Sequence, residues 1–271
     1  METLLSKKIG LIAGDGELPV KLAGSARNDG FEVVAISLSS SNAKRLAGYC
    51  QKIYPFGPGE IQKIINTLHK EKISQLTFVG KVSKGILFRK PWLDKRALNL
   101  LKQVKRLNDD AVMITLIDEL SKENISVFDQ TIFLKELLAP KGVLGGYVPD
   151  DSQKADIEYG FEIAKEIGRI DIGQTVVVQN KMILAVEAIE GTDKAIERGC
   201  KLGDGKAVVI KVSKPNQDKR FDIPTVGLNT LKTMKKFGAK VLAVEAENTF
   251  IVEKDEMIDF ADRYKMVFVA V

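Results

Sequence analysis

The sequence predicts an α/β protein with two domains: an N-terminal Rossmann-like domain with a parallel sheet, and a C-terminal α/β domain with a mixed sheet. Its 271 residues exceed the usual size of one domain. Short apolar runs alternate with helical patterns, which is typical of parallel strands connected by crossover helices. Two hairpin-like connections in the second half, Asn180-Lys181 and Glu247-Asn248-Thr249, favour a mixed sheet there.

The first half of the chain contains the elements of the parallel sheet. Pro19 suits a first helical turn and Gly30 follows the last one, so residues 18–28 are predicted to form the first crossover helix. The pair Asp109-Asp110 is expected to cap a later helix. The strands are expected at residues 9–13, 32–38, 52–54, 76–79 and 125–128. Further helices are expected at residues 59–70, 93–107 and 110–123.

A stretch rich in Gly and Pro, residues 139–151, lacks apolar periodicity and is predicted to be a linker. It separates an N-terminal domain (1–138) from a C-terminal catalytic domain (152–271). In the second domain, helices are expected at residues 153–167, 193–198, 228–237 and 255–264. Its strands are expected at residues 175–179, 182–188, 207–212, 241–244, 250–253 and 266–271.

The amino-acid composition limits where in the cell the protein is expected and which kinds of catalytic site it could contain. No apolar run approaches the roughly 20 residues of a membrane span, and the N-terminus lacks a signal-peptide pattern, so we expect a cytoplasmic protein. Cys50 and Cys200 are expected to be reduced thiols. His69 is the only histidine, which excludes a Cys/His zinc cluster. Ser-His-Asp catalysis would depend on that one residue without a nucleophile-elbow motif.

Positive charge is concentrated in one segment, although the net charge of +5 is mild and we expect no nucleic acid as partner. Between residues 81 and 106 the only acid is Asp94. Two interpretations stay open: a solvated helix face, or attraction to an anionic substrate or to the acidic inner leaflet of a membrane. The sequence leaves oligomerisation open. The basic residues of this segment are Lys81, Lys84, Arg89, Lys90, Lys95, Arg96, Lys102, Lys105 and Arg106.

The turn after the first expected strand is a candidate phosphate site, because its glycines let the backbone approach a ligand. A tight turn without a ligand is the alternative. Pro19 replaces the third glycine of the dinucleotide fingerprint, and serines follow the second strand where an acidic residue would hold a ribose, so NAD is disfavoured. The candidate binding residues here are Gly14, Gly16, Leu18 and Pro19.

Carboxylates gather where a second-domain strand ends and a helix begins, over residues 186–193. Helix amides attract anions and carboxylates attract hard cations, a combination that suits a metal-bound phosphate group. Gly191 and Thr192 are therefore candidates for substrate binding, and Glu187, Glu190 and Asp193 for metal binding. The alternative is that these carboxylates are solvated and that Thr192 is only a helix cap.

A basic, polar loop follows the strand at 207–212 and contains Asp222 beside apolar residues. Loops that join scaffold elements commonly present catalytic residues. Lys214 and Arg220 are candidates to neutralise phosphate charge, while Asp222 is a candidate to bind a metal or to orient a water molecule. A plain turn explains the same residues equally well.

Six segments together resemble the LpxI-type UDP-2,3-diacylglucosamine pyrophosphatases. They are IAGDGELP (12–19), FVGKV (78–82), DD (109–110), EIGRIDIGQ (166–174), AVEAIEGTD (185–193) and FDIPTVG (221–227). The resemblance implies metal-dependent hydrolysis of UDP-2,3-diacylglucosamine to UMP and 2,3-diacylglucosamine 1-phosphate in lipid A biosynthesis, with Mg²⁺ or another divalent cation. It implies Asp222 as the catalytic aspartate, and it adds Gly80, Lys81, Val82 and Thr225 to the expected substrate contacts.

Two rivals to this interpretation are distinguishable. A non-catalytic protein that binds a nucleotide sugar or an acidic lipid, peripherally on the inner membrane, would show binding without turnover. An NAD-dependent sugar oxidoreductase would need the missing ribose-binding acid and an acid/base residue beside the nicotinamide.

Overall fold

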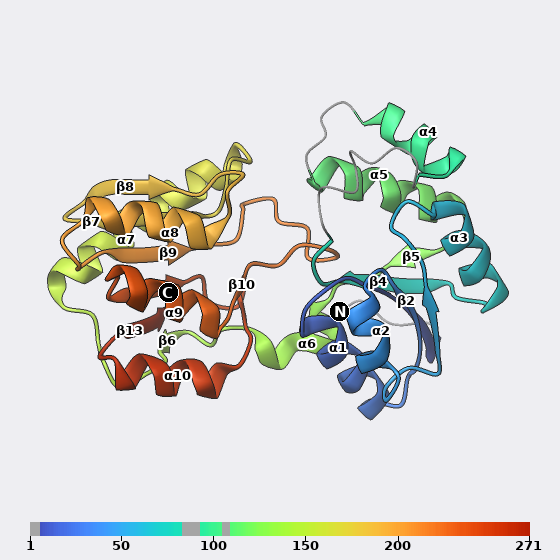
Figure 1. The fold of residues 1–271 in the computed structure, drawn as a ribbon, viewed down its shortest axis with the longest axis horizontal. Coiled ribbons are helices and arrows are strands. Elements are labelled where there is room, and N and C mark those ends of the chain that lie inside the picture. Colours follow the sequence, from blue (N-terminus) through green and yellow to red (C-terminus); the bar gives the residue numbers. More distant parts are fainter. Residues whose placement is uncertain (1–5, 83–92, 105–108) are drawn as a thin grey trace. The chain divides into compact units, whose positions relative to one another are not determined.

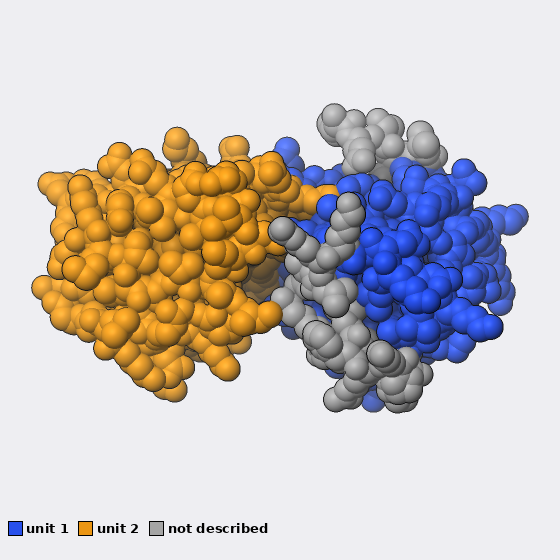
Figure 2. All heavy atoms as spheres, turned by 90° about the horizontal axis from the view of Figure 1, so that it is seen from above, with its two compact units in different colours: residues 1–135, 219–221 blue, residues 136–218, 222–271 orange. Residues whose placement is uncertain are grey.

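A computed structural model describes residues 6–82, 93–104 and 109–271 of the chain. The chain forms two compact units, which Figure 2 shows in separate colours. Unit 1 comprises Met1–Lys135 and Lys219–Phe221, and unit 2 comprises Glu136–Asp218 and Asp222–Val271. Each unit has its own sheet and its own buried apolar core, and the predicted α/β class is confirmed.

Unit 1 contains a parallel sheet (Figure 1). Its strands are β1 (Lys8–Ala13), β2 (Glu32–Ser37), β3 (Lys52–Pro55), β4 (Gln75–Val79) and β5 (Ser126–Val127). They lie in the order β3-β2-β1-β4-β5. The chain moves outward from β1 to β3 and then returns to the other side of β1. The carboxyl ends of β1 and β4 therefore form the topological switch point, where open α/β sheets commonly bind ligands.

Helices cover both faces of this sheet. In α1 the apolar residues Leu22, Ala23 and Ala26 are fully buried, and the helix contacts β1, β2 and β4. In α3, four apolar residues at helical spacing, from Ile61 to Leu68, pack into the core on the opposite face. The short helix α2 was not predicted, because SSNAKRL lacks apolar periodicity. The described helices are α1 (Leu18–Asn28), α2 (Ser40–Leu46), α3 (Ile61–Lys70), α4 (Lys95–Gln103), α5 (Asp109–Lys122) and α6 (Thr131–Leu134).

Unit 2 contains a mixed sheet in the order β6-β13-β11-β9-β7-β8. Its strands are β6 (Gly142–Val143), β7 (Thr175–Gln179), β8 (Met182–Val186), β9 (Val208–Lys211), β11 (Val241–Val244) and β13 (Val267–Ala270). Strands β9, β11 and β13 are parallel, whereas β7 is antiparallel to both β8 and β9. The carboxyl ends of β8, β9, β11 and β13 consequently lie at one edge of the sheet.

One of the two expected hairpins is present. Asn180 and Lys181 connect β7 to β8 with φ of 54° and 55°, the left-handed conformation of tight hairpin turns. The other expectation was wrong. Residues 247–249 lead from β11 to β12 (Phe250–Ile251), which pairs in parallel with β10 (Thr225–Val226) in a separate sheet. The residues of a turn do not determine whether the strand after the turn pairs with the strand before it.

Two apolar cores enclose the unit 2 sheet, one on each face. The core on the first face includes Ile157 and Ala164 of α7 (Asp151–Arg169). The core on the second face includes apolar residues of α8 (Thr192–Leu202), α9 (Leu228–Phe237) and α10 (Lys254–Arg263). None of the described helices is long and apolar enough to cross a membrane.

The segment expected to be a linker, residues 139–151, lies within unit 2. Ala139 is fully buried, and β6 pairs with β13 in antiparallel register. Asp150 caps α7 in a capping box with Gln153. The Gly and Pro residues of this segment therefore accompany a short edge strand and a helix start. The chain passes between the units at 135–136, 218–219 and 221–222.

Candidate functional site

The carboxyl edge of the unit 2 sheet brings together residues that are distant in sequence. Glu187 follows β8, Lys211 ends β9, and Thr192 begins α8. Thr175 is the register partner of Lys211, and its carbonyl accepts the backbone N–H of Glu187. Strand alternation then places Glu187, Thr175 and Lys211 in one transverse row, on the face that α8 covers. Carboxyl ends of parallel strands are a common location for ligand sites.

Lys211, Thr192 and Glu187 form a chain of hydrogen bonds. Lys211 Nζ donates to Thr192 Oγ1 over 2.8 Å, and this hydroxyl donates to Glu187 Oε1 over 2.9 Å. Lys211 is only 7% exposed. The other carboxylate oxygen, Glu187 Oε2, is buried and accepts no hydrogen bond from the described residues. Sequence reasoning missed Lys211; the available signal was a lysine at the end of a strictly apolar strand.

The remaining carboxylates of the acidic stretch have separate surroundings. Glu190 forms an ion pair of 2.6 Å with Arg198 and accepts the backbone N–H of Ala188. The hydrogen bond from Arg198 lowers the pKa of Glu190 below its ordinary value. Asp193 is exposed in the first turn of α8. Within the described ranges, no group of three or more His, Cys, Asp or Glu side chains is arranged to hold a metal ion.

Asp222 lies in the loop between β9 and β10. Its backbone N–H donates to the carbonyl of Asp218 over 3.0 Å, and its Oδ2 accepts a hydrogen bond from Gln217 Nε2. The next residues, Ile223 and Pro224, are buried, and the Pro224 carbonyl accepts the N–H of Phe250. Asp222 is thus held between a polar turn and the two-stranded sheet that contains Thr225. Sequence reasoning missed Gln217.

Charged side chains anchor the start of this loop. Glu245, which follows β11, accepts the N–H of Ser213 over 2.7 Å. Lys165 of α7 donates to the carboxylate of Glu245 and to the carbonyl of Ser213, each over 2.8 Å. Lys214 Nζ lies 2.7 Å from Asp171 Oδ1, so the lysine expected to neutralise phosphate is ion-paired here. Arg220 belongs to the short segment of the loop that lies in unit 1.

Two glycines of the segment EIGRIDIGQ contact this site. A β-carbon added to Gly168 would lie 3.3 Å from the α-carbon of Lys214, so the end of α7 approaches the loop closely. A β-carbon added to Gly173 would lie 2.1 Å from the carbonyl oxygen of Glu187, closer than such atoms can approach. Gly173 therefore permits the backbone before β7 to pass against the end of β8.

At the switch point of unit 1, the loops after β1 and β4 bond to each other. Gly14 N–H donates to the Val79 carbonyl, and Asp15 and Lys81 exchange two backbone hydrogen bonds of 2.8 and 3.0 Å. These amides of Gly14 and Asp15 are therefore engaged by protein carbonyls. A β-carbon on Gly14 would lie 2.5 Å from the Lys81 carbonyl oxygen. The two loops approach so closely that a side chain at position 14 or 80 would collide with the backbone of the other loop, which explains the glycines at both positions.

The other candidate residues of this turn have diverse environments. Leu18 is half-buried and Pro19 is buried in the first turn of α1, whereas Gly16 and Val82 are exposed. Asn42 of α2, which sequence reasoning missed, is 1% exposed. Its side-chain amide donates to the carbonyls of Gly14 and Gly16 over 2.6 and 2.9 Å. This buried amide fixes the conformation of the turn.

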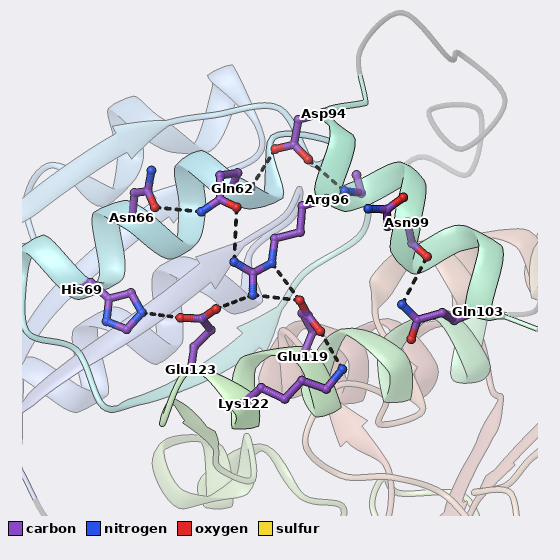
Figure 3. A network of polar contacts seen from close by, with 11 residues as sticks. Gln62, Asn66, His69, Asp94, Arg96, Asn99, Gln103, Glu119, Lys122 and Glu123 are labelled. Atoms are coloured by element: carbon purple, nitrogen blue, oxygen red, sulfur yellow. Dashed lines mark hydrogen bonds and ion pairs between the residues drawn. The ribbon is translucent and has the colours of Figure 1, made fainter.

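The only histidine lies in a polar network that joins α3, α4 and α5 (Figure 3). Arg96 of α4 pairs with Glu119 of α5 and with Glu123, which directly follows that helix, and His69 of α3 is 2.9 Å from Glu123. Hydrogen bonds from Arg96 and then from His69 lower the pKa of Glu123. Because the carboxylates are paired with cations, the network is best explained as an attachment between helices.

The structure describes part of the basic segment between residues 81 and 106. Lys84, Arg89, Lys90, Lys105 and Arg106 lie outside the described residues. Among the others, Lys81, Lys95 and Lys102 are exposed. Arg96 is 19% exposed at its side chain and engaged in the helix network, so it does not contribute to an exposed basic face.

Comparisons with known proteins agree over both units. The model of the LpxI N-terminal domain matches residues 8–137, and the model of the LpxI C-terminal domain matches residues 140–269. A relative from Caulobacter vibrioides, named UDP-2,3-diacylglucosamine pyrophosphatase LpxI, is 34% identical over 267 residues. That match covers 94% of this chain and 94% of the relative.

Two solved structures show a remote likeness to this chain. A biotin carboxylase domain of a thermophilic 2-oxoglutarate carboxylase has a TM-score of 0.27 and 16% identity, over 63% of this chain and 34% of that chain. An N5-carboxyaminoimidazole ribonucleotide synthetase from Thermotoga maritima has a TM-score of 0.25 and 17% identity, over 67% of this chain and 42% of that chain. TM-scores this low do not indicate a shared overall fold. The two domain models and the full-length relative show that the chain belongs to the LpxI family.

Proposed function

We propose that this chain hydrolyses the pyrophosphate bond of UDP-2,3-diacylglucosamine, giving UMP and 2,3-diacylglucosamine 1-phosphate in lipid A biosynthesis. The observation that carries the proposal is the 34% identity, over 94% of both chains, with the relative of that name. The geometry supports the same reaction class, because Asp222 is held in an organised polar loop that begins at the carboxyl edge of a mixed sheet.

Asp222 is the residue proposed to act on the reacting phosphate, by orienting a water molecule or by binding a cation. Mg²⁺ is commonly held by one or two carboxylates together with substrate phosphates, so a single aspartate suits this role. Among the described residues, the four carboxylates expected from the sequence do not form a group of three or more that could hold a metal ion. When bound, the cation would supply positive charge to the phosphate oxygens.

The test measures UMP release from UDP-2,3-diacylglucosamine by the purified full-length protein, with Mg²⁺ and with a chelator in parallel. We expect turnover with Mg²⁺, its loss with the chelator, and its return when Mg²⁺ is added in excess. Substrate binding without UMP release would reject hydrolysis in favour of a non-catalytic binding protein. Turnover that the chelator leaves unchanged would reject the metal requirement alone.

Hydrolysis in ¹⁸O-labelled water shows which phosphorus the water attacks. Label in UMP identifies attack on the uridine-side phosphorus, and label in the sugar phosphate identifies attack on the other. Absence of label from both products would show that water is not the acceptor of the phosphoryl group, which contradicts hydrolysis.

Transient contact with the inner leaflet of the membrane is also part of this proposal, because the substrate carries two acyl chains. Among the described residues, the exposed Lys81, Lys95 and Lys102 and the 47%-exposed Val82 support it. Sedimentation with anionic vesicles should decrease as salt is raised, since salt screens attraction between exposed charges. Sedimentation that is absent or independent of salt would reject electrostatic association.

A further inference from the structure

We propose that Gln217 is a positioning residue for this hydrolysis, and that its side-chain amide fixes the orientation of the Asp222 carboxylate. The inference rests on the proposed function, which gives Asp222 a reaction to serve. Gln217 lies five positions before Asp222 in the loop between β9 and β10. Its Nε2 atom donates a hydrogen bond to Asp222 Oδ2.

The second contact of the Gln217 amide determines which way the amide faces. Gln217 Oε1 lies 2.9 Å from the backbone nitrogen of Lys214, which can only donate. The amide oxygen therefore faces Lys214, and the NH₂ group faces Asp222. The Asp222 carboxylate oxygen Oδ2 is thus the acceptor of a hydrogen bond whose donor has a fixed direction.

The backbone of Gln217 is fixed as well. Its N–H donates to the Lys214 carbonyl over 3.0 Å, which closes a tight turn with Pro215 at the second position. Proline restricts the φ angle there. Just before this turn, Glu245 accepts the N–H of Ser213 and ties the loop to the end of β11. The donor atom is thus placed by a turn that the sheet edge holds.

Asp222 is held from the other side of the same loop. Its N–H donates to the Asp218 carbonyl, and Ile223 after it is buried. The backbone of the aspartate is therefore fixed. The hydrogen bond from the Gln217 amide in addition restricts rotation of its carboxylate. Partners that orient a reacting or metal-binding group typically change activity by about 10- to 100-fold when they are removed.

Two substitutions separate positioning of Asp222 from support of the loop. Gln217→Glu keeps an oxygen that can accept the Lys214 N–H, but it replaces the donor to Asp222 with a second carboxylate. Gln217→Met removes both contacts at similar size. We expect both variants to lower kcat by about 10- to 100-fold, with KM changed by less than about threefold. Asn216→Ala, at an exposed position of the same turn, is the matched control and should retain wild-type kcat.

The possible results distinguish failure of the role of Gln217 from failure of the proposed hydrolysis. Wild-type kcat in Gln217→Glu together with a loss in Gln217→Met would show that Gln217 only supports the loop, and would overturn the inference while hydrolysis stands. A rise in KM with unchanged kcat would also overturn it, because that pattern indicates substrate binding. Absence of UMP release by the wild-type protein would reject the proposed function and the role of Gln217 together. Thermal unfolding of each variant shows whether the fold is intact.

Discussion

Lys211 Nζ donates a hydrogen bond to Thr192 Oγ1 over 2.8 Å, which joins the last residue of β9 to the first residue of α8. The same hydroxyl donates to Glu187, so one threonine connects a buried cation to a carboxylate at the end of β8. These contacts tie together three elements at the edge of the sheet where the loop of Asp222 begins.

Thr192→Val should destabilise unit 2, because it removes both hydrogen bonds at nearly constant volume and leaves Lys211 without this partner. The expected loss in the free energy of unfolding is about 1–3 kcal/mol. Thr192→Ser keeps the hydroxyl and serves as the control. Urea denaturation measures the difference, and equal stability of the Val and Ser variants would show that the hydroxyl is not needed.

Gly173→Ala should be destabilising by roughly 1–3 kcal/mol, because the new β-carbon would lie 2.1 Å from a backbone carbonyl that cannot easily move. The comparison is Gly227→Ala, where the nearest atom would be 3.7 Å away. Both variants are compared by urea denaturation. A loss at residue 173 no larger than at residue 227 would contradict the close approach of the two strand ends.

Asp156→Ala should destabilise the β7–β8 hairpin. Asp156 of α7 is 3% exposed and accepts the N–H groups of Asn180 and Lys181 over 2.9 and 2.6 Å. Loss of two charge-assisted hydrogen bonds predicts a cost of about 2–4 kcal/mol. Asp156→Asn retains one acceptor oxygen and should fall between the wild type and the Ala variant. Hydrogen exchange of the two turn amides provides the local measurement.

Acid should remove a stabilising contribution from Glu71 at the amino edge of the unit 1 sheet. Glu71 is 4% exposed, and hydrogen bonds from Tyr54 and Lys52 lower its pKa from 4.5 to about 2. Because the folded pKa is depressed, the contribution is complete above pH 4.5 and is lost as the pH falls toward about 2. The stability difference between wild type and Glu71→Gln should shrink across that range. A difference independent of pH would contradict this assignment.

Asp222→Asn should reduce kcat by about 10²- to 10⁴-fold while substrate binding persists, because it removes the charge but retains the size of the side chain. Kinetics of UMP release and equilibrium binding of the substrate are the two measurements. Asp151→Asn changes an exposed carboxylate on α7 and should leave both unchanged. Near-wild-type turnover by the Asp222 variant would reject its catalytic role.

Much of the fold could be predicted because the decisive signals are local. Pro19 and Gly30 defined the bounds of α1. Apolar runs located every strand of the unit 1 sheet and every strand of the six-stranded unit 2 sheet except β6, which lies in the expected linker. Helix α2 was not predicted because it buries only Asn42 and Leu46, so its sequence has no repeating apolar pattern. The expected hairpin at residues 247–249 was wrong because β12 pairs with β10 rather than with β11, and that partner is distant in sequence.

The sequence by itself determined the family, through six ordered segments, and it drew attention to Asp222 as the residue to substitute. Only the tertiary structure decided which side chains meet. It separated Glu190 from Glu187 by pairing the former with Arg198, and it placed Lys211 beside Thr192. The physical reason is that alternation and turn signals depend on neighbouring residues, whereas strand register and buried hydrogen bonds depend on partners that the fold brings from elsewhere in the chain.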